Sequence, residues 1–241
     1  MVPRMSKLAL PSVTLVMVDT VCHDLAAMAV KECTDRAEFG EVLIISDKQL
    51  DVPGATHYYV EPFTDVEAAT RAYWYMVPPL LTTDHFMVVH WDSWIVNPGK
   101  WDRDFLAYDY IGAPWWYGED RNVGNGGFSI RSTRLANYMA GSSLPFVHPE
   151  DDALCRKYRP RLEVAGFEWA PVELASRFAF ERTAYCPLKD IFGFHGMFNW
   201  PHVLSPEAIE ERVAKAPDYV LKHVHYDQMR MAQAAMREQT A

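Results

Sequence analysis

The sequence predicts an α/β fold, in which a single domain is built on a mostly parallel, mixed sheet flanked by helices. In the first hundred residues, short β-branched apolar runs alternate with stretches of helical composition. Several of these runs end on an acidic or small polar residue, as buried parallel strands do at a ligand-binding edge. The length of 241 residues suits one domain with a sizeable core. We therefore expect a ligand site at the carboxyl ends of the strands.

The first hundred residues contain the more regular part of the pattern. Strands are predicted for the apolar runs at residues 13–18, 41–45, 56–60 and 86–89. Helices are predicted at residues 23–33 and 65–77. Asp65 is a suitable N-cap for the second helix, and Pro78 and Pro79 end it. We interpret residues 8–100 as a nucleotide-binding half.

The remaining sequence is less regular. Strands are predicted at residues 109–115, 128–131 and 173–181. Helices are predicted at residues 133–139, 151–157, 206–215 and 228–239. Ser132 and Ser205 are suitable N-caps for the first and third of these helices. We interpret residues 101–205 as an acceptor-binding and catalytic half and residues 206–241 as a C-terminal helical tail, all within one domain.

Composition argues against several classes of protein. A formal net charge of −9 is unsuited to binding a nucleic-acid backbone, although a metal ion can still attract a single nucleotide. No run of residues approaches the roughly 20 apolar residues of a membrane-spanning helix. The cysteines have neither CxxC nor zinc-site spacing, which favours reduced thiols and a cytoplasmic location. They are Cys22, Cys33, Cys155 and Cys186.

Polar residues follow three of the predicted strands. Asp19 and Thr20 follow the first, Ser46 and Asp47 the second, and Asp92 the fourth, within the segment His90-Trp91-Asp92-Ser93. A carboxylate in such a position can hold a divalent ion that in turn holds a diphosphate. Mn²⁺ and Mg²⁺ both accept oxygen ligands, and Mn²⁺ also accepts imidazole. The alternative is that Asp92 only caps a turn.

A glycine-rich segment precedes the strand at 128–131. Gly126 and Gly127 lack a Cβ atom, so another group can approach the backbone closely there. An ordinary loop or bulge explains the pattern equally well. The segment is not a phosphate-binding P-loop, because it lacks the GKS/T ending.

Two later segments offer catalytic or metal-binding side chains. In Glu150-Asp151-Asp152, neighbouring carboxylates repel one another, so one of them can serve as a general base. Solvated acids at a helix N-terminus are the alternative. His195, between two glycines in Gly193-Phe194-His195-Gly196, is either a metal ligand or a core histidine. His223 and His225 form a rival ligand pair.

The order of these segments resembles one family. An aspartate after a strand is followed by Ile-Gly-Ala-Pro-Trp, Gly-Asn-Gly-Gly-Phe-Ser-Ile-Arg-Ser, Pro-Glu-Asp and Phe-Gly-Phe-His-Gly. Over roughly residues 10 to 200, this order resembles the DUF5672 family, which is placed near the GT-A glycosyltransferases. The pattern is also similar to that of inverting GT-A enzymes in general. The resemblance implies a GT-A-like, Rossmann-like domain that uses Mn²⁺ or Mg²⁺. It also implies a nucleotide-diphosphate sugar as donor and a glycan or small molecule as acceptor.

The resemblance also implies roles for individual residues. Asp92 matches the last, metal-binding acid of a DxD turn, His90 stands in place of the first acid, and His195 matches the late histidine of the metal shell. Asp151 matches the base, with Glu150 as second choice. The expected donor and acceptor contacts are Asp19, Thr20, Ser46, Asp47, Trp115, Asn125, Gly126 and Gly127.

Three further hypotheses accompany this interpretation. Residues 117–123 are expected to form a lid over the donor. A non-catalytic carbohydrate-binding protein is one alternative, since the chain is rich in aromatic residues. A metal-dependent hydrolase or nucleotidyltransferase is another. The nucleotidyltransferase is disfavoured because residues 19–30 contain neither glycine nor a basic side chain.

Overall fold

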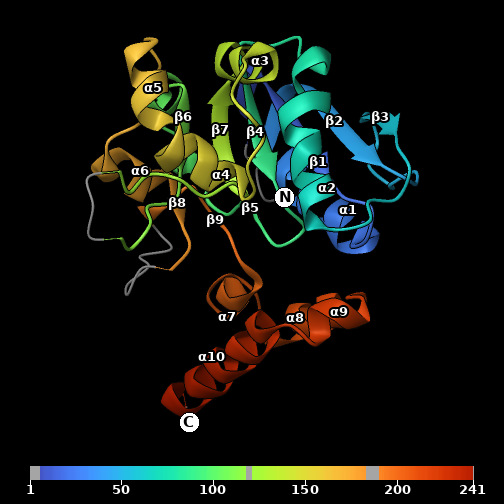
Figure 1. Cartoon of the computed structure of the whole chain (residues 1–241). Helices are drawn as coiled ribbons and strands as arrows, with labels where there is room; N and C mark the ends of the chain where they lie inside the picture. Colours follow the sequence, from blue (N-terminus) through green and yellow to red (C-terminus); the bar gives the residue numbers. More distant parts are fainter. Residues whose placement is uncertain (1–5, 118–120, 183–189, 241) are drawn as a thin grey trace.

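The computed structural model describes residues 6–117, 121–182 and 190–240, with side chains described as far as residue 238. Its centre is a six-stranded sheet with the strand order β3-β2-β1-β4-β7-β6 (Figure 1). The bounds of these strands, in chain order, are β1 Leu8–Val18, β2 Ala37–Ser46, β3 Thr56–Tyr59, β4 His85–Val89, β6 Tyr110–Gly112 and β7 Phe128–Ser132. β1 to β4 are parallel to one another, whereas β7 is antiparallel to both β4 and β6. The predicted mostly parallel, mixed sheet is confirmed.

Both faces of the sheet are covered. Alternate residues of β1 point to opposite sides: Leu15 and Met17 pack in one core cluster, and Val16 and Val18 in another. α1 (His23–Arg36) packs on the first face. The second face is covered by the end of a helical segment that consists of α2 (Val66–Arg71), a π-helical turn (Ala72–Met76) and a 3₁₀ turn (Pro78–Leu80). Continuous apolar strands follow from this two-sided burial.

Several predicted helix ends are confirmed. Asp65 caps α2 by accepting a hydrogen bond from Ala68 N at 2.8 Å, and the regular helix has ended before Pro78. Ser132 caps α3 (Thr133–Gly141) and Ser205 caps α8 (Pro206–Val213) in the same way. The helix predicted at 151–157 begins one residue earlier, as α4 (Glu150–Asp152), and continues as a π-helical turn (Ala153–Lys157). It is followed by α5 (Arg159–Val164).

The strand predicted at 173–181 is wrong. Most of that segment is α6 (Val172–Phe178), and only Ala179–Phe180 forms a strand, β8. Leu174, Ala175 and Phe178 are the buried residues of α6, and their spacing places them on one helical face. The strand predicted at 109–115 is also shorter, because only Tyr110–Gly112 pairs as β6.

A second, small sheet has the order β5-β9-β8 and contains β5 (Trp94–Ile95) and β9 (Gly193–Phe194). β9 pairs antiparallel with β5 and parallel with β8. Short 3₁₀ turns lie at Pro98–Lys100, Arg103–Leu106 and Met197–Asn199. This sheet joins a segment that follows β4 to one more than ninety residues later in the chain.

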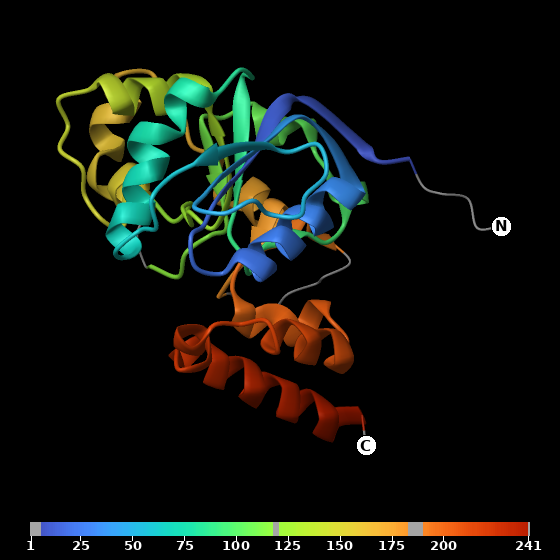
Figure 2. The same ribbon diagram turned by 90° about the vertical axis from the view of Figure 1, so that its right-hand side faces the viewer.

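The C-terminal helices form a separate layer beside the α/β body (Figure 2). They are α7 (Trp200–Val203), α8, α9 (Asp218–Leu221) and α10 (Val224–Thr240). α10 packs on α7 and on the 3₁₀ turn at Met197–Asn199. Within the described part of the chain, no helix combines the length and the apolar character needed to cross a membrane.

Candidate functional site

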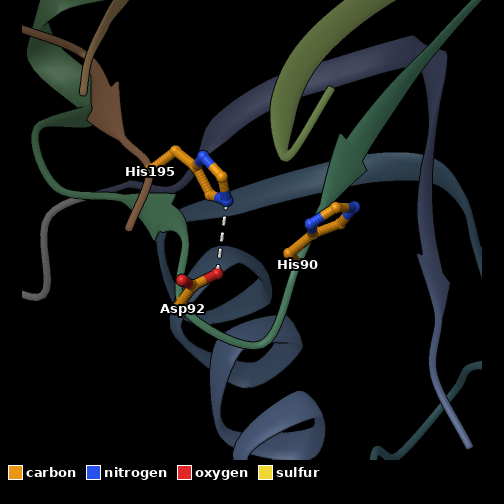
Figure 3. Close-up of side chains that lie close together, drawn as sticks. All are labelled: His90, Asp92 and His195. Carbon is orange, nitrogen blue, oxygen red and sulfur yellow. Dashed lines mark ion pairs between the residues drawn. The ribbon is translucent and has the colours of Figure 1, made fainter. Parts of the chain in front are cut away.

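Two strand pairings bring the predicted metal ligands together. Asp92 stands two residues before Trp94 of β5, and His195 follows Phe194 of β9; Trp94 and Phe194 are directly paired. The His195 Nε2 atom consequently lies 3.4 Å from Asp92 Oδ1 (Figure 3). His90, which follows β4, completes the group: one ligand atom from each of His90, Asp92 and His195 lies within 4.8 Å of the others.

Gly127 leaves the space that His195 occupies. β7 begins directly after Gly127, and the pairing of β4 with β7 continues as a 2.9 Å hydrogen bond from His90 N to Gly127 O. A Cβ atom on Gly127 would lie 2.2 Å from His195 Nε2. Any other residue at this position would therefore displace the imidazole.

Neighbouring groups orient both ligands. His195 Nδ1 lies 3.3 Å from Glu181 Oε1 and 3.0 Å from Asn125 Nδ2, so the opposite nitrogen, Nε2, faces Asp92. Asp92 Oδ2 accepts a hydrogen bond from Met197 N at 3.1 Å, which leaves Oδ1 directed at His195. A carboxylate behind a histidine is a common second-sphere arrangement in metal sites.

The charges of this group are set by its neighbours. Burial lowers the pKa of His195, but Asp92 and Glu181 outweigh burial and raise it to about 10. Burial raises the pKa of Asp92, but the neighbouring His195 outweighs it, so the net shift is downward. Burial, with the charge of His195, lowers the pKa of His90 to about 4, so that imidazole is neutral. The protonated His195 therefore lies between two carboxylates, and a divalent ion would have to displace that proton to bind.

These residues fit a transition-metal ion. Two imidazoles and one carboxylate suit Mn²⁺, which accepts both nitrogen and oxygen, better than Mg²⁺, which prefers oxygen. Among the described residues, this is the one group of three or more such side chains close enough to share an ion. His223 and His225, the rival pair, have ring centroids 4.4 Å apart, and His225 Nε2 lies 2.6 Å from the Arg182 guanidinium.

Asp151 contacts the other glycine of the segment. Its Oδ2 atom accepts a hydrogen bond from Gly126 N at 2.8 Å, and a Cβ on Gly126 would lie 3.3 Å from Asp151 Cβ. Asp151 and His195 are thus in contact with adjacent residues, Gly126 and Gly127. Asp151 itself is only half-buried.

Glu150 is in a different situation. It is 6 % exposed and forms an ion pair with Arg131, which is itself buried. Burial raises the pKa of Glu150, and Arg131 opposes that shift. Because its carboxylate is engaged by a guanidinium, Glu150 is a weaker candidate for a base than Asp151.

A cavity of about 520 Å³ lies at the ends of β1 and β4. Asp19, Thr20, His90 and Glu150 line it, together with Tyr73 from the π-helical turn and Tyr219 from α9. The Asp19 carboxylate accepts hydrogen bonds from the backbone N–H groups of Val21 and Cys22. The structure therefore brings Asp19 and Thr20 to the same cavity as His90.

Other predicted contacts lie elsewhere. Ser46 is 1 % exposed, Asp47 is bonded to His23, and neither lines this cavity. Trp115 packs on Gly124, where a Cβ would lie 2.2 Å from the indole ring. The predicted lid at 117–123 and Cys186 fall partly or wholly outside the described residues. Cys22, Cys33 and Cys155 are free and buried.

Sequence reasoning missed Glu181, Tyr73 and Tyr219. Glu181 lies at the end of a predicted strand, Tyr73 within a predicted helix, and Tyr219 in the predicted C-terminal tail. Only the pairing of β8 with β9 reveals Glu181, since it places Phe180 beside Phe194 and hence Glu181 beside His195. No local sequence pattern distinguishes these three residues.

Residues 73–195, about half of the chain, match the model of a family described as "Protein of unknown function (DUF5672)". The chain belongs to the DUF5672 family. The matched segment begins at Tyr73 and ends at His195, so it contains Asp92, Gly127 and Asp151 as well. The family resemblance inferred from the motifs is confirmed. No curated protein matches this DUF5672 chain in sequence.

Solved structures similar to this DUF5672 member are glycosyltransferases. One is a glycosyltransferase involved in the glycosylation of the major capsid of PBCV-1 (TM-score 0.48, 13% identity, 77% of this chain and 92% of that chain covered). A second is the mannosyltransferase PcManGT from Pyrobaculum calidifontis, in complex with GDP-Man and Mn²⁺ (TM-score 0.45, 11% identity, 98% of this chain and 78% of that chain covered). A third is the galactosyltransferase LgtC with donor and acceptor sugar analogs (TM-score 0.47, 11% identity, 86% of this chain and 98% of that chain covered). Similarity at this level concerns the course of the fold and says nothing about substrate.

Proposed function

We propose that this chain is a metal-dependent glycosyltransferase, which moves a sugar from a nucleotide-diphosphate donor to a hydroxyl group of a glycan or small-molecule acceptor. One observation carries the proposal: Asp92 pairs with His195, and His195 and Asp151 contact the adjacent residues Gly127 and Gly126. Beside them lies a cavity of about 520 Å³, a volume within the usual range for small-molecule sites.

In this proposal, His90, Asp92 and His195 hold the metal, and Mn²⁺ suits them better than Mg²⁺. The ion supplies positive charge against the leaving diphosphate. The described residues that line the cavity include neither lysine nor arginine. Residues 8–100 then form most of the donor side and residues 101–205 most of the acceptor side of one domain.

Asp151 is the proposed base. It takes the proton from the acceptor hydroxyl while that oxygen forms its bond to the anomeric carbon and the bond from that carbon to the phosphate oxygen breaks. A direct displacement of this kind inverts the anomeric centre. The hydrogen bond from Gly126 N orients one carboxylate oxygen of Asp151. The Glu150–Arg131 ion pair is the reason for preferring Asp151 over Glu150.

Binding to Mn²⁺ and nucleotides tests the proposal. Thermal unfolding is followed with UDP, GDP, UDP-glucose, UDP-galactose and GDP-mannose, each with and without Mn²⁺. A ligand that binds only the folded state raises the melting temperature by mass action. We expect at least one nucleotide to raise it only when Mn²⁺ is present. If no nucleotide does so, the glycosyltransferase assignment is wrong.

Asp151→Asn separates catalysis from binding. We expect this variant to keep the Mn²⁺-dependent nucleotide shift and to lose turnover by about 10²- to 10⁴-fold, the usual contribution of a general base. Turnover is measured as release of nucleoside diphosphate in the presence of acceptor. Unchanged turnover in Asp151→Asn would contradict the role of Asp151. A carbohydrate-binding protein would show sugar binding without turnover in either form.

A further inference from the structure

The hydroxyl group of Tyr73 is buried and lacks a partner. Tyr73 is 8 % exposed, and its hydroxyl oxygen makes no hydrogen bond to any described residue. The main chain of Val18 is close enough to act on this hydroxyl. Buried hydroxyl groups are nearly always satisfied, because leaving one without a partner costs stability. A free buried hydroxyl beside a cavity therefore points to a ligand.

Tyr73 belongs to the lining of the cavity at the ends of β1 and β4. Tyr73, Val18, Asp19 and Glu150 all line that cavity, and both carboxylates act electrostatically on the Tyr73 hydroxyl. The ring is held in place on its other sides. Its centroid lies 5.9 Å from that of His90 and 5.9 Å from the Arg131 guanidinium carbon.

The surroundings indicate what kind of group would bind there. Asp19, Asp65 and Glu150 are the acidic residues of the lining, and its described residues include no lysine or arginine. Such a lining disfavours a phosphate group but suits a hydroxyl group, which can donate to a carboxylate and accept from the tyrosine. Burial raises the pKa of Tyr73, so its hydroxyl stays protonated and available as a donor.

We propose that Tyr73 hydrogen-bonds a hydroxyl group on the donor, either on the transferred sugar or on the ribose, and so acts as a specificity residue of this cavity. The inference rests on the proposed glycosyltransferase function. The charged diphosphate of the donor would then bind near Asp92 and His195. The uncharged, hydroxyl-bearing part of the donor would bind at Tyr73.

Tyr73→Phe tests this directly, because it removes only the hydroxyl. Since that hydroxyl has no partner in the free protein, we expect the melting temperature without ligand to be equal to or higher than that of the wild type. We expect the Kd of a Mn²⁺-dependent nucleotide-sugar, measured by calorimetry with UDP-glucose, UDP-galactose and GDP-mannose, to rise about 3- to 10-fold. The Kd for Mn²⁺ alone should not change.

Binding of UDP and GDP shows which hydroxyl group Tyr73 contacts, because these nucleotides contain the ribose but lack the transferred sugar. A Kd that rises for the nucleotide-sugar only indicates a sugar hydroxyl, and equal rises for both indicate the ribose. Tyr138→Phe is the control, because Tyr138 is 44 % exposed and lies on α3, away from the cavity lining.

Two results would overturn the Tyr73 proposal while leaving the glycosyltransferase assignment intact. One is unchanged nucleotide-sugar binding in Tyr73→Phe when the wild type binds with Mn²⁺. The other is a lower melting temperature of the free Tyr73→Phe variant, which would show that the hydroxyl has a structural role. If the wild type itself binds no nucleotide with Mn²⁺, both proposals fail together.

Discussion

Two aspartate–histidine pairs lie near strand ends in this protein, and they differ in what they can do. Asp92 and His195 follow β4 and β9, whereas Asp47 follows β2 and His23 begins α1. The two pairs are similarly buried: the side chains of His195 and Asp92 are 19 and 9 % exposed, and those of His23 and Asp47 are 19 and 12 % exposed. Burial alone does not separate them.

The two pairs differ in the distance between their ligand atoms and in the side chains that surround them. His23 and Asp47 are joined by a direct contact of 2.6 Å, and among the described residues no third ligand atom lies within 4.8 Å of both. Asp92 and His195 are 3.4 Å apart, with His90 close to both and Glu181 behind His195. A pair that satisfies itself is complete without a ligand. Asp92 and His195 also form an ion pair, but their ligand atoms are farther apart and His90 lies beside them, which suits a shared ion better.

The largest expected effect is on metal binding. Asp92→Asn removes the only carboxylate of the three-residue group, and we expect the Mn²⁺ affinity to fall roughly 100-fold or more, since a neutral amide is a poor ligand. The matched change Asp47→Asn should alter the Mn²⁺ affinity by no more than about 2-fold. Calorimetry on both variants provides the measurement. Equal losses in the two variants would mean that the pairs do not differ as described.

Gly127→Ala tests the space beside His195. The added Cβ would lie 2.2 Å from His195 Nε2, so the imidazole must move and Mn²⁺ affinity should fall by roughly 10- to 100-fold. Gly141→Ala is the control, because nothing lies within 4 Å of a Cβ there. Circular dichroism establishes that both variants fold. Wild-type Mn²⁺ affinity in folded Gly127→Ala would contradict the role of His195.

Glu181→Gln addresses the orientation of His195. Glutamine keeps the size of the side chain but loses the charge, so we expect about a 10-fold weaker Mn²⁺ affinity, as for other residues that support a metal ligand. Glu173→Gln, an exposed change on α6, should bind Mn²⁺ as the wild type does. If Glu181→Gln binds Mn²⁺ with the affinity of the wild type, Glu181 does not orient His195 for metal binding.

The smallest effect is expected for the stability of the fold, when the pair of His23 and Asp47 is removed. Burial raises the pKa of Asp47, but the hydrogen bond and the charge of His23, with smaller contributions from the backbone and Lys48, together outweigh it and the net shift is downward. A lowered carboxyl pKa stabilises the fold above the ordinary pKa, and this stabilisation is lost as the pH falls through the lowered value. We expect His23→Ala to unfold about 0.5–1 kcal/mol more easily near neutral pH. Urea titrations should show the difference shrinking below roughly pH 4, and a difference that grows in acid would contradict this account.

The strand ends and helix caps could be predicted because their causes are local. A run such as Val13–Val18 is apolar throughout because both faces of β1 are covered, and Asp65 and Ser132 cap helices through bonds to residues three positions later. Segment 173–181 could not be predicted in the same way. Its apolar residues fit either a strand or a helix, and only packing decides between the two.

The sequence by itself determined the family, the class of fold and the acids and histidines available for chemistry. It could not determine which aspartate–histidine pair lies beside a third ligand, because that depends on pairing between β5 and β9, residues about a hundred positions apart. The same holds for Glu181, Tyr73 and Tyr219, whose side chains meet the site through tertiary packing alone. Local sequence patterns predict which side of a segment is buried. The distances between ligand atoms depend instead on how distant segments pair, which local patterns do not contain.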